Sequence, residues 1–301
     1  MNGQLAGLPA TGLSKNSVGL GLRSSHIDQI LQQRPEVPWF EVLMENHTAR
    51  GGLIADQLAA VREHYPISLH CLGMSIGGVD PLNMDYLATL KWMIKQYQPV
   101  QVSDHLCFTR YGKHQFNDLL PIPLTTESFQ HIGSRIKQIQ DYLGIRILIE
   151  NVSSYLQFEA SEMNEAEFLS ELVSETGCGI LLDINNAYVN EFNHGYSAKA
   201  FIDTLPIDSV GEVHLAGYED KSDYLIDAHN NRVTDPVWAL FEYYLQYAKG
   251  APVLIEWDND IPEFSVLLDE AEKAERIISR TSESRFPGSV RTDVPGKCAT
   301  C

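Results

Sequence analysis

The sequence has no long apolar run and no targeting segment. The first stretch, Met1–Ser17, carries a single Lys and no apolar centre of the kind found in signal peptides. No later stretch is apolar enough to cross a bilayer as a helix, so we expect no membrane partner. Cysteine is scarce as well, and five residues without a secretory signal do not suit a disulfide framework. These absences predict a cytoplasmic protein in a reducing compartment.

Positive charge is also in short supply. The chain has 22 Lys and Arg against 40 Asp and Glu, which gives a net charge of −18. This field repels a phosphate backbone, so nucleic acid is not expected as a partner. No G-x-G-x-x-G follows a predicted strand, which argues against a dinucleotide site. The acidic excess suits a site that collects cations, although an ordinary acidic surface accounts for most of it.

Short apolar runs alternate with longer amphipathic stretches along most of the chain. Strands are expected at Val18–Leu22, Trp39–Leu43, Ile67–Cys71, Val100–Asp104, Arg146–Glu150, Ile180–Ile184, Val210–Leu215 and Val253–Trp257. Helices are expected at Ser25–Gln33, Leu53–His64, Pro81–Tyr97, Thr125–Leu143, Asn164–Glu175, Ala198–Thr204, Pro236–Tyr247 and Glu263–Ile278. Eight such strand–helix units predict parallel pairing and a closed barrel.

We therefore expect an α/β protein with a single (β/α)8 TIM barrel over residues 1–280. A long loop holding Tyr111–Pro123 should follow the fourth strand. Residues 281–301 are polar, contain Pro and Gly, and end in Cys298-x-x-Cys301, so we expect a flexible C-terminal extension outside the barrel.

Potential metal ligands stand at the ends of six successive predicted strands. The active site of a β/α barrel lies at the C-terminal ends of its strands. The residues that end strands three to eight include His70, His105, Glu150, Asp183, His214 and Glu256. Carboxylates crowded into one barrel mouth would repel one another without a cation. The set is too large for one ion, so two or three are expected, and this ligand chemistry leaves iron, manganese and zinc open.

Long motifs carry a resemblance that covers about Val18–Ala274. The chain resembles the multinuclear non-heme iron-dependent oxidative enzymes, a family that includes the iron subunit of methanobactin biosynthesis. The motifs are Gly19–Arg23 with His26, Glu45–Asn46, Ser68–His70, Ser103–Leu106, Asn117–Pro123, Glu150–Tyr155, Leu182–Asn186, Asn193–Gly195, His214–Gly217, Asp227–His229, Pro236–Trp238 and Glu256–Asp258.

The resemblance implies a TIM barrel of the xylose-isomerase-like or endonuclease IV-like kind that holds two or three iron ions. It implies dioxygen as co-substrate, a ribosomally made precursor peptide as substrate, and oxidation of its cysteines, as in methanobactin-type oxazolone and thioamide formation. It also implies a small partner protein that recognises the leader of the precursor. The ligands carried over are His70, His105, Glu150, Asp183, Asn186, His214, Asp227, His229 and Glu256.

Three further residues are candidate catalytic or supporting residues. Asn151 is a ligand or supports one, and His194 supports the site or acts as acid or base. Arg23 binds a substrate carboxylate or pairs with Glu41 or Glu45 at the rim.

Alternative functions stay open from the residues alone. The ligand spacing also resembles that of endonuclease IV-type DNA-repair hydrolases, which carry zinc, but Asn186 stands where such enzymes have a His. Metal-dependent sugar isomerases share the barrel but lack the Glu150–Tyr155 and Asn117–Pro123 motifs, and a non-catalytic binding protein does not explain so many ligands. The metal content distinguishes these functions: bound iron would indicate an oxidative enzyme, and bound zinc would indicate a hydrolase.

The C-terminal residues Val294–Cys301 carry a motif of their own. One Cys-x-x-Cys is a weak zinc signal without a second pair. The segment resembles the Cys-rich core of a methanobactin-type precursor, so a substrate-like role stands beside an inert tail.

Overall fold

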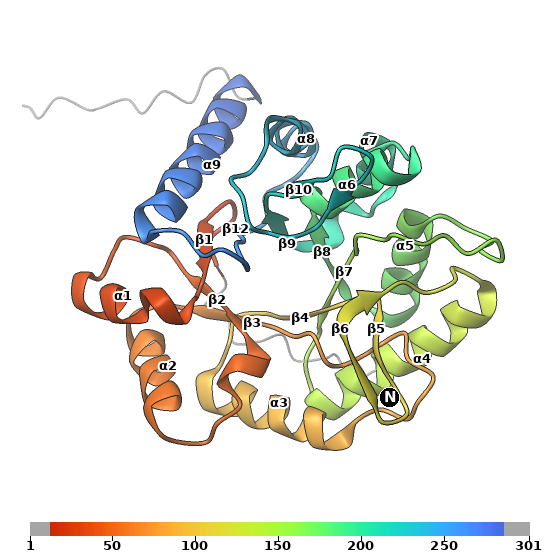
Figure 1. Ribbon diagram of the computed structural model, residues 1–301, viewed down its shortest axis with the longest axis horizontal. Helices are drawn as coiled ribbons and strands as arrows, with labels where there is room; N and C mark the ends of the chain where they lie inside the picture. Colours follow the sequence, from red (N-terminus) through yellow and green to blue (C-terminus); the bar gives the residue numbers. More distant parts are fainter. Residues whose placement is uncertain (1–12, 286–301) are drawn as a thin grey trace, which may run out of the picture.

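The computed structural model describes residues 13–285, and its central feature is a closed barrel of parallel strands (Figure 1). The strands are β1 (Val18–Gly21), β2 (Phe40–Leu43), β3 (Ile67–His70), β4 (Val102–His105), β7 (Leu148–Glu150), β8 (Gly179–Asp183), β9 (Val210–Leu215) and β12 (Val253–Ile255). Each pairs with the next barrel strand along the chain, and β12 pairs with β1 to close the ring. The predicted (β/α)8 barrel is confirmed.

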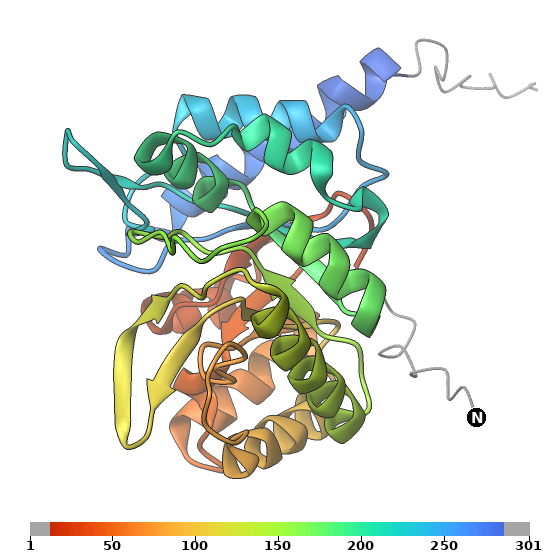
Figure 2. The same ribbon diagram turned by 90° about the vertical axis from the view of Figure 1, so that its right-hand side faces the viewer.

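Helices connect the strands and cover the outside of the barrel, as the two views in Figures 1 and 2 show. Asn83, Thr125, Asn164 and Ser197 cap helix starts by accepting a backbone N–H three residues on, because the first N–H groups lack partners within a helix. The helices are α1 (Ile27–Gln33), α2 (Leu53–His64), α3 (Met84–Tyr97), α4 (Thr126–Leu143), α5 (Glu165–Thr176), α6 (Ile184–His194), α7 (Ala198–Thr204), α8 (Asp235–Leu245) and α9 (Phe264–Arg285), with 3-10 turns at Ser24–His26, Met44–His47 and Ile207–Ser209.

Two elements lie where the sequence predicted a loop or no element. The expected loop Tyr111–Pro123 contains most of an antiparallel hairpin of β5 (Phe108–Tyr111) and β6 (His114–Leu120). The side chains of β6 are largely exposed, so the strand shows no apolar alternation that could have predicted it. A second small hairpin joins β10 (Glu219–Asp220) to β11 (Leu225–Ile226).

Helix α6 begins directly where β8 ends, and the sequence pattern did not predict it. Four of its eleven residues are Asn, which has a low helix propensity. Asp183 caps the helix, since its Oδ1 accepts a hydrogen bond from the backbone N–H of Asn186 at 2.6 Å. The last residue of the strand therefore also fixes the start of the helix.

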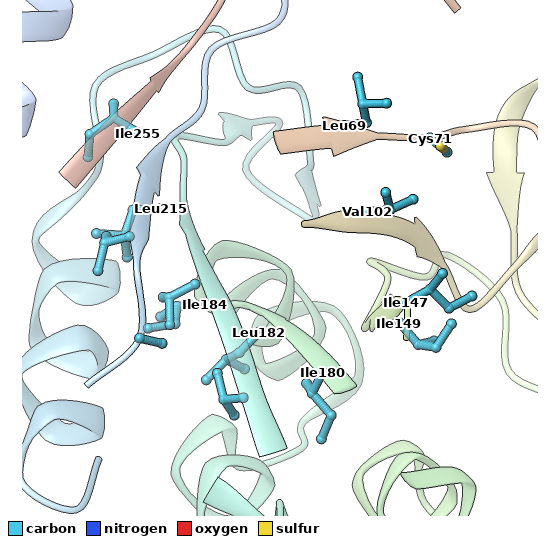
Figure 3. Packing of buried hydrophobic residues seen from close by; sticks show 14 of the residues in the cluster. Leu69, Cys71, Val102, Ile147, Ile149, Ile180, Leu182, Ile184, Leu215 and Ile255 are labelled. Atoms are coloured by element: carbon cyan, nitrogen blue, oxygen red, sulfur yellow. The ribbon is translucent and has the colours of Figure 1, made fainter. Parts of the chain in front are cut away.

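Alternation along the strands separates an apolar shell from a polar interior. Leu69, Ile149, Leu182, Leu215 and Ile255 are buried in the hydrophobic core, which Figure 3 shows at close range. The residue directly before or after each of them is a His, Glu or Asp, and successive side chains of a strand point to opposite faces. The same strands thus supply the core outside and the polar groups inside.

The Trp39 side chain packs directly against Gly19 of β1 and leaves no room for a Cβ atom there. A Cβ atom added at Gly19 would lie 2.3 Å from the Trp39 ring, so no larger residue fits there without moving that buried side chain.

Three of the five cysteines lie in the described region, and Cys71, Cys107 and Cys178 are buried free thiols. Within residues 13–285, no helix is long and apolar enough to cross a membrane. Helix α9 runs to Arg285, and the Cys298-x-x-Cys301 motif lies outside the described residues.

Candidate metal centre

Seven of the nine predicted ligands gather in overlapping groups of three at the C-terminal ends of the strands. The first group is His70, His105 and Glu150, the second is Glu150, Asp183 and His214, and the third is Asp183, His229 and Glu256. In each group, the possible ligand atoms lie within 4.8 Å of one another. Glu150 and Asp183 belong to two groups each, so the three groups form one connected cluster.

In the first group, the three possible ligand atoms lie at nearly equal distances from one another. The Nε2 atoms of His70 and His105 are 3.3 Å apart, and Glu150 Oε2 lies 3.4 Å and 3.2 Å from them. Ligands held about 2.0–2.2 Å from one ion lie roughly 2.8–3.6 Å from each other in tetrahedral or octahedral sites. Nδ1 of His70 lies 2.7 Å from Ser103 Oγ, a contact that orients the ring with Nε2 toward Glu150. These three atoms fit one cation.

His229 connects Asp227 and Asp258 to the third group. Its Nε2 lies 2.5 Å from Asp227 Oδ1, while its Nδ1 lies 3.3 Å from Glu256 Oε2 and 3.0 Å from Asp258 Oδ2. Asp227 is further held by Asn185, whose side-chain amide donates to Asp227 Oδ1 at 2.8 Å. The predicted ligand Asp227 is therefore not a member of the third group but contacts it through His229.

Arg23 supports the rim of this third group. It donates to the backbone oxygen of Trp257 at 2.8 Å and forms an ion pair with Asp258. Of the two predicted roles, a rim ion pair is present but with Asp258 in place of Glu41 or Glu45, and binding of a substrate carboxylate stays a prediction. Burial raises the pKa of Asp258, but the hydrogen bond with His229 and the charges of His229 and Arg23 outweigh it and hold this pKa well below its usual range. Asp258 thus stays ionised beside His229.

Asn151 and Asn186 connect the ligand-bearing segments. Asn151 accepts from the backbone N–H of Asp183 and donates to its carbonyl, both at 2.9 Å, so the side chain holds Asp183 in place. The Asn186 amide donates to the backbone oxygen of Asn151 at 3.1 Å and to Glu150 Oε1 at 3.5 Å. Asn186 Oδ1 faces no hydrogen-bond partner within the described chain.

A further group of Glu41, Glu212 and His214 was not predicted from the sequence. His214 Nδ1 lies 2.8 Å from Glu256 Oε2, while its Nε2 lies 3.4 Å from Glu41 Oε2 and 3.6 Å from Glu212 Oε1. Burial and the charge of Glu41 raise the pKa of Glu212 to about 8. Both Glu residues lie within strands rather than at their ends. In the sequence, each could have been recognised as a charged residue inside an otherwise apolar predicted strand.

The donor atoms behave as a cation site would require. Glu150 and Asp183 are 1% and 0% exposed, and burying carboxylates without counter-charge is costly. Burial and the charge of Asp227 raise the pKa of Asp183 to about 7. Asp183 Oδ2 and Asn186 Oδ1 are buried and make no hydrogen bond within residues 13–285. Oxygen and imidazole donors that lack other partners and converge in this way fit bound metal ions of the iron, manganese or zinc type.

His194 lies at the end of α6, on the side of the loop that follows β7. Its Nε2 lies 2.7 Å from the backbone oxygen of Ser154 and 3.1 Å from Ser154 Oγ. Asn190, one turn earlier, donates to the Val152 oxygen and accepts from the Ser154 N–H, both at 2.9 Å. Helix α6 therefore fixes the loop after β7 through its polar side chains, and His194 is close to that loop rather than within a ligand group.

Comparisons with known proteins give the family of the chain and agree with its fold. Residues 17–279 match the family described as RiPP precursor modification enzyme MbnB/TglH/ChrH. A UPF0276 protein of Acaryochloris marina (strain MBIC 11017) is 47% identical over 260 residues, which cover 86% of this chain and 94% of that protein.

Solved structures share the barrel at much lower identity. Endonuclease IV from Thermus thermophilus has a TM-score of 0.56 and 15% identity, with 89% of this chain and 99% of that chain covered. A D-tagatose 3-epimerase-like protein has a TM-score of 0.58 and 15% identity, with coverage of 91% and 100%. At such identities the likeness shows the fold alone, which is the endonuclease IV-like and xylose-isomerase-like barrel that the sequence predicted.

Proposed function

The chain belongs to the family of RiPP precursor modification enzymes MbnB/TglH/ChrH, and on that premise we propose that it is a multinuclear iron oxidase. In this proposal, it uses dioxygen to modify cysteine residues of a ribosomally made precursor peptide. Methanobactin-type oxazolone and thioamide formation, or related cysteine chemistry, is the reaction class. A small partner protein that recognises the leader belongs to the same proposal.

The observation that carries the proposal is the sharing of Glu150 and Asp183 between neighbouring ligand groups. A carboxylate shared in this way can bridge two ions, so the cluster suits two or three ions rather than one. The ions would be held by the three groups defined above, with Asn186 and Asp227 as further ligands. Bound iron with open positions would supply dioxygen binding and would favour the thiolate form of a substrate cysteine.

The protein's own residues have separable roles around the cluster. Asn151 positions Asp183 through its two backbone hydrogen bonds, and Arg23 positions Asp258, which contacts His229. His194 is the remaining acid–base candidate, because it lies beside Ser154 in the loop that leaves the ligand Glu150.

An oxygen-dependence assay tests the function. Chain loaded anaerobically with Fe²⁺ would be mixed with each small cysteine-containing peptide encoded beside its gene, with and without oxygen, and the products followed by mass spectrometry. We expect an oxidative mass change on cysteine only with both iron and oxygen. His194→Gln should keep its iron and lose about 10²-fold or more in rate, as loss of an acid or base does. Equal turnover without oxygen would exclude the oxidase.

The same preparation distinguishes the proposed oxidase from the alternative function, a zinc-dependent hydrolase. A zinc-loaded chain that cleaves abasic-site DNA while the iron-loaded chain leaves every peptide unchanged would favour the endonuclease IV-type function. The acidic charge of −18 and Asn186 both weigh against that outcome.

A further inference from the structure

His214 lies inside the barrel, where its ring has no contact with solvent. Its neighbours on β9, Val213 and Leu215, belong to the hydrophobic core, in which Figure 3 shows Leu215. Because side chains alternate along a strand, His214 points to the opposite face, and Glu212 shares that face two residues earlier. Both ring nitrogens of His214 must therefore find their partners within the barrel.

The Nδ1 atom of His214 faces the other candidate ligands. It lies 2.8 Å from Glu256 Oε2, and the same oxygen lies 3.3 Å from Nδ1 of His229. Ligand atoms that share one ion lie roughly 2.8–3.6 Å apart. Nδ1 is therefore the nitrogen of His214 that can bind a metal together with Glu256.

The Nε2 atom of His214 faces a different pair of carboxyl groups. It lies 3.4 Å from Glu41 Oε2 and 3.6 Å from Glu212 Oε1. Glu41 lies on β2 between Phe40 and Val42, which belong to the hydrophobic core, so alternation turns it inward as well. Within residues 13–285, Nε2 makes no hydrogen bond, and neither does the Oε1 atom of Glu41 or of Glu212.

Neighbouring polar side chains hold these two carboxyl groups in place. Ser68 Oγ donates to Glu41 Oε2 at 3.3 Å, and Gln101 Nε2 donates to Glu212 Oε2 at 3.0 Å. Ser68 lies on β3 directly beside Glu41 in the strand register. The separation between Glu41 and His214 exceeds an ordinary N–H···O hydrogen bond of about 2.7–3.2 Å only slightly, so a small movement of the ring completes it.

We propose that Glu41 is a positioning residue for His214. Its carboxyl group, with Glu212 beside it, accepts the N–H of Nε2 and so keeps Nδ1 free of a proton and directed at the metal. A carboxylate on the far nitrogen of a metal-bound imidazole fixes both the tautomer and the ring orientation. The inference rests on the proposed function in that it takes His214 as a ligand, and it gives the group of Glu41, Glu212 and His214 a role without an ion of its own.

The protonation of the two ring nitrogens tests this assignment directly in the native chain. Chain with isotope-labelled histidine would be loaded with Zn²⁺, which is diamagnetic, and studied by long-range proton–nitrogen NMR. The signals of His214 are identified by their loss in His214→Gln. We expect a proton on Nε2 and none on Nδ1, whose resonance shifts on metal binding. A proton on Nδ1 with the metal on Nε2 would overturn the proposal.

Zn²⁺ affinity, measured by competition with a fluorescent chelator, tests the contribution of Glu41. Glu41→Leu removes the acceptor, and we expect one bound ion to weaken about 10–100-fold, whereas Glu41→Gln keeps an oxygen acceptor and should stay within about threefold. Glu171→Leu, at an exposed position of α5, is the control. Urea unfolding of the metal-free protein should find Glu41→Leu at least as stable as the native chain, since an apolar side chain replaces a buried carboxyl group.

This division separates positioning from a merely structural role, which would lower stability without metal. Native Zn²⁺ affinity in Glu41→Leu, or a loss that Glu41→Gln shares in full, would overturn the role of Glu41. The proposed function fails separately: the expected NMR and affinity results without oxygen-dependent cysteine oxidation would remove the oxidase and leave the positioning role. Oxidation at the native rate and metal content in Glu41→Leu would remove the positioning role alone.

Discussion

The Nε2 atoms of His70 and His105 lie 3.3 Å apart in the barrel mouth, and both imidazole rings are buried. Glu150 Oε2 completes the triangle with both of them. Such a convergence of ring nitrogens and a carboxylate is what a bound cation would stabilise. The first group is also joined to the other two through Glu150, so the effect of changing it should extend beyond one ion.

Glu150→Gln should reduce metal content more than the loss of one ordinary ligand would. The shared carboxylate becomes a neutral amide, which cannot bridge two ions in the same way. We expect iron per chain, measured by inductively coupled plasma mass spectrometry after anaerobic loading, to fall by at least one ion. Glu171→Gln, an exposed change on α5, is the control. Unchanged iron content in Glu150→Gln would contradict the shared-ligand arrangement.

Asn151→Asp should destabilise the fold. The amide group that donates to the Asp183 carbonyl at 2.9 Å becomes an oxygen facing an oxygen, in a residue that is 0% exposed. The expected loss in the free energy of unfolding is about 2–4 kcal/mol. Urea unfolding of metal-free protein measures it, with Asn231→Asp at an exposed site as the matched control. A loss no larger than that of the control would show that Asn151 does not hold Asp183.

Glu212→Gln should be tolerated. Burial and the charge of Glu41 raise the pKa of Glu212 to about 8, so the carboxyl group is mostly protonated at pH 7 and Gln resembles that form. We expect unfolding free energy within about 1 kcal/mol of the native chain and unchanged iron content. Loss of one ion per chain would mean instead that Glu41, Glu212 and His214 hold a metal of their own.

Glu165→Gln should change how stability depends on pH. Burial raises the pKa of Glu165 from 4.5 to about 7 in the folded chain. The protonated form favours folding, so its contribution is complete below pH 4.5 and is lost as pH rises through 7. Glu165→Gln should therefore gain about 2 kcal/mol relative to the native chain between pH 5.5 and pH 8.

Chelator-treated protein unfolded in urea at both pH values measures this gain. Glu167→Gln would disturb the α5 capping box, so Glu171→Gln serves as the control here too. Parallel stability curves for Glu165→Gln and the native chain would show that Glu165 is not buried in solution.

The sequence predicted the barrel and most of the candidate centre because both follow from short-range rules. The strand-end rule collected His70, Asp183 and Glu256 at one mouth of the barrel. The helical pattern likewise found α2, whose bounds Leu53–His64 agree with the prediction.

What the sequence left out depends on contacts between distant segments. Helix α6 is rich in Asn and is stabilised by hydrogen bonds to Val152 and Leu225. These partners lie outside the helix, so its local helix propensity does not include their contribution. Glu212 lies in the middle of a strand, so the rule that selects residues at strand ends did not identify it.

Anomalous scattering at the iron edge would locate the bound iron ions in the barrel mouth. Crystals of anaerobically iron-loaded chain would be measured on both sides of the iron K edge. We expect two or three iron peaks among the three ligand groups, with Glu150 or Asp183 between neighbouring peaks. A single peak, peaks away from these residues, or peaks that follow the zinc edge instead would contradict the proposed iron cluster.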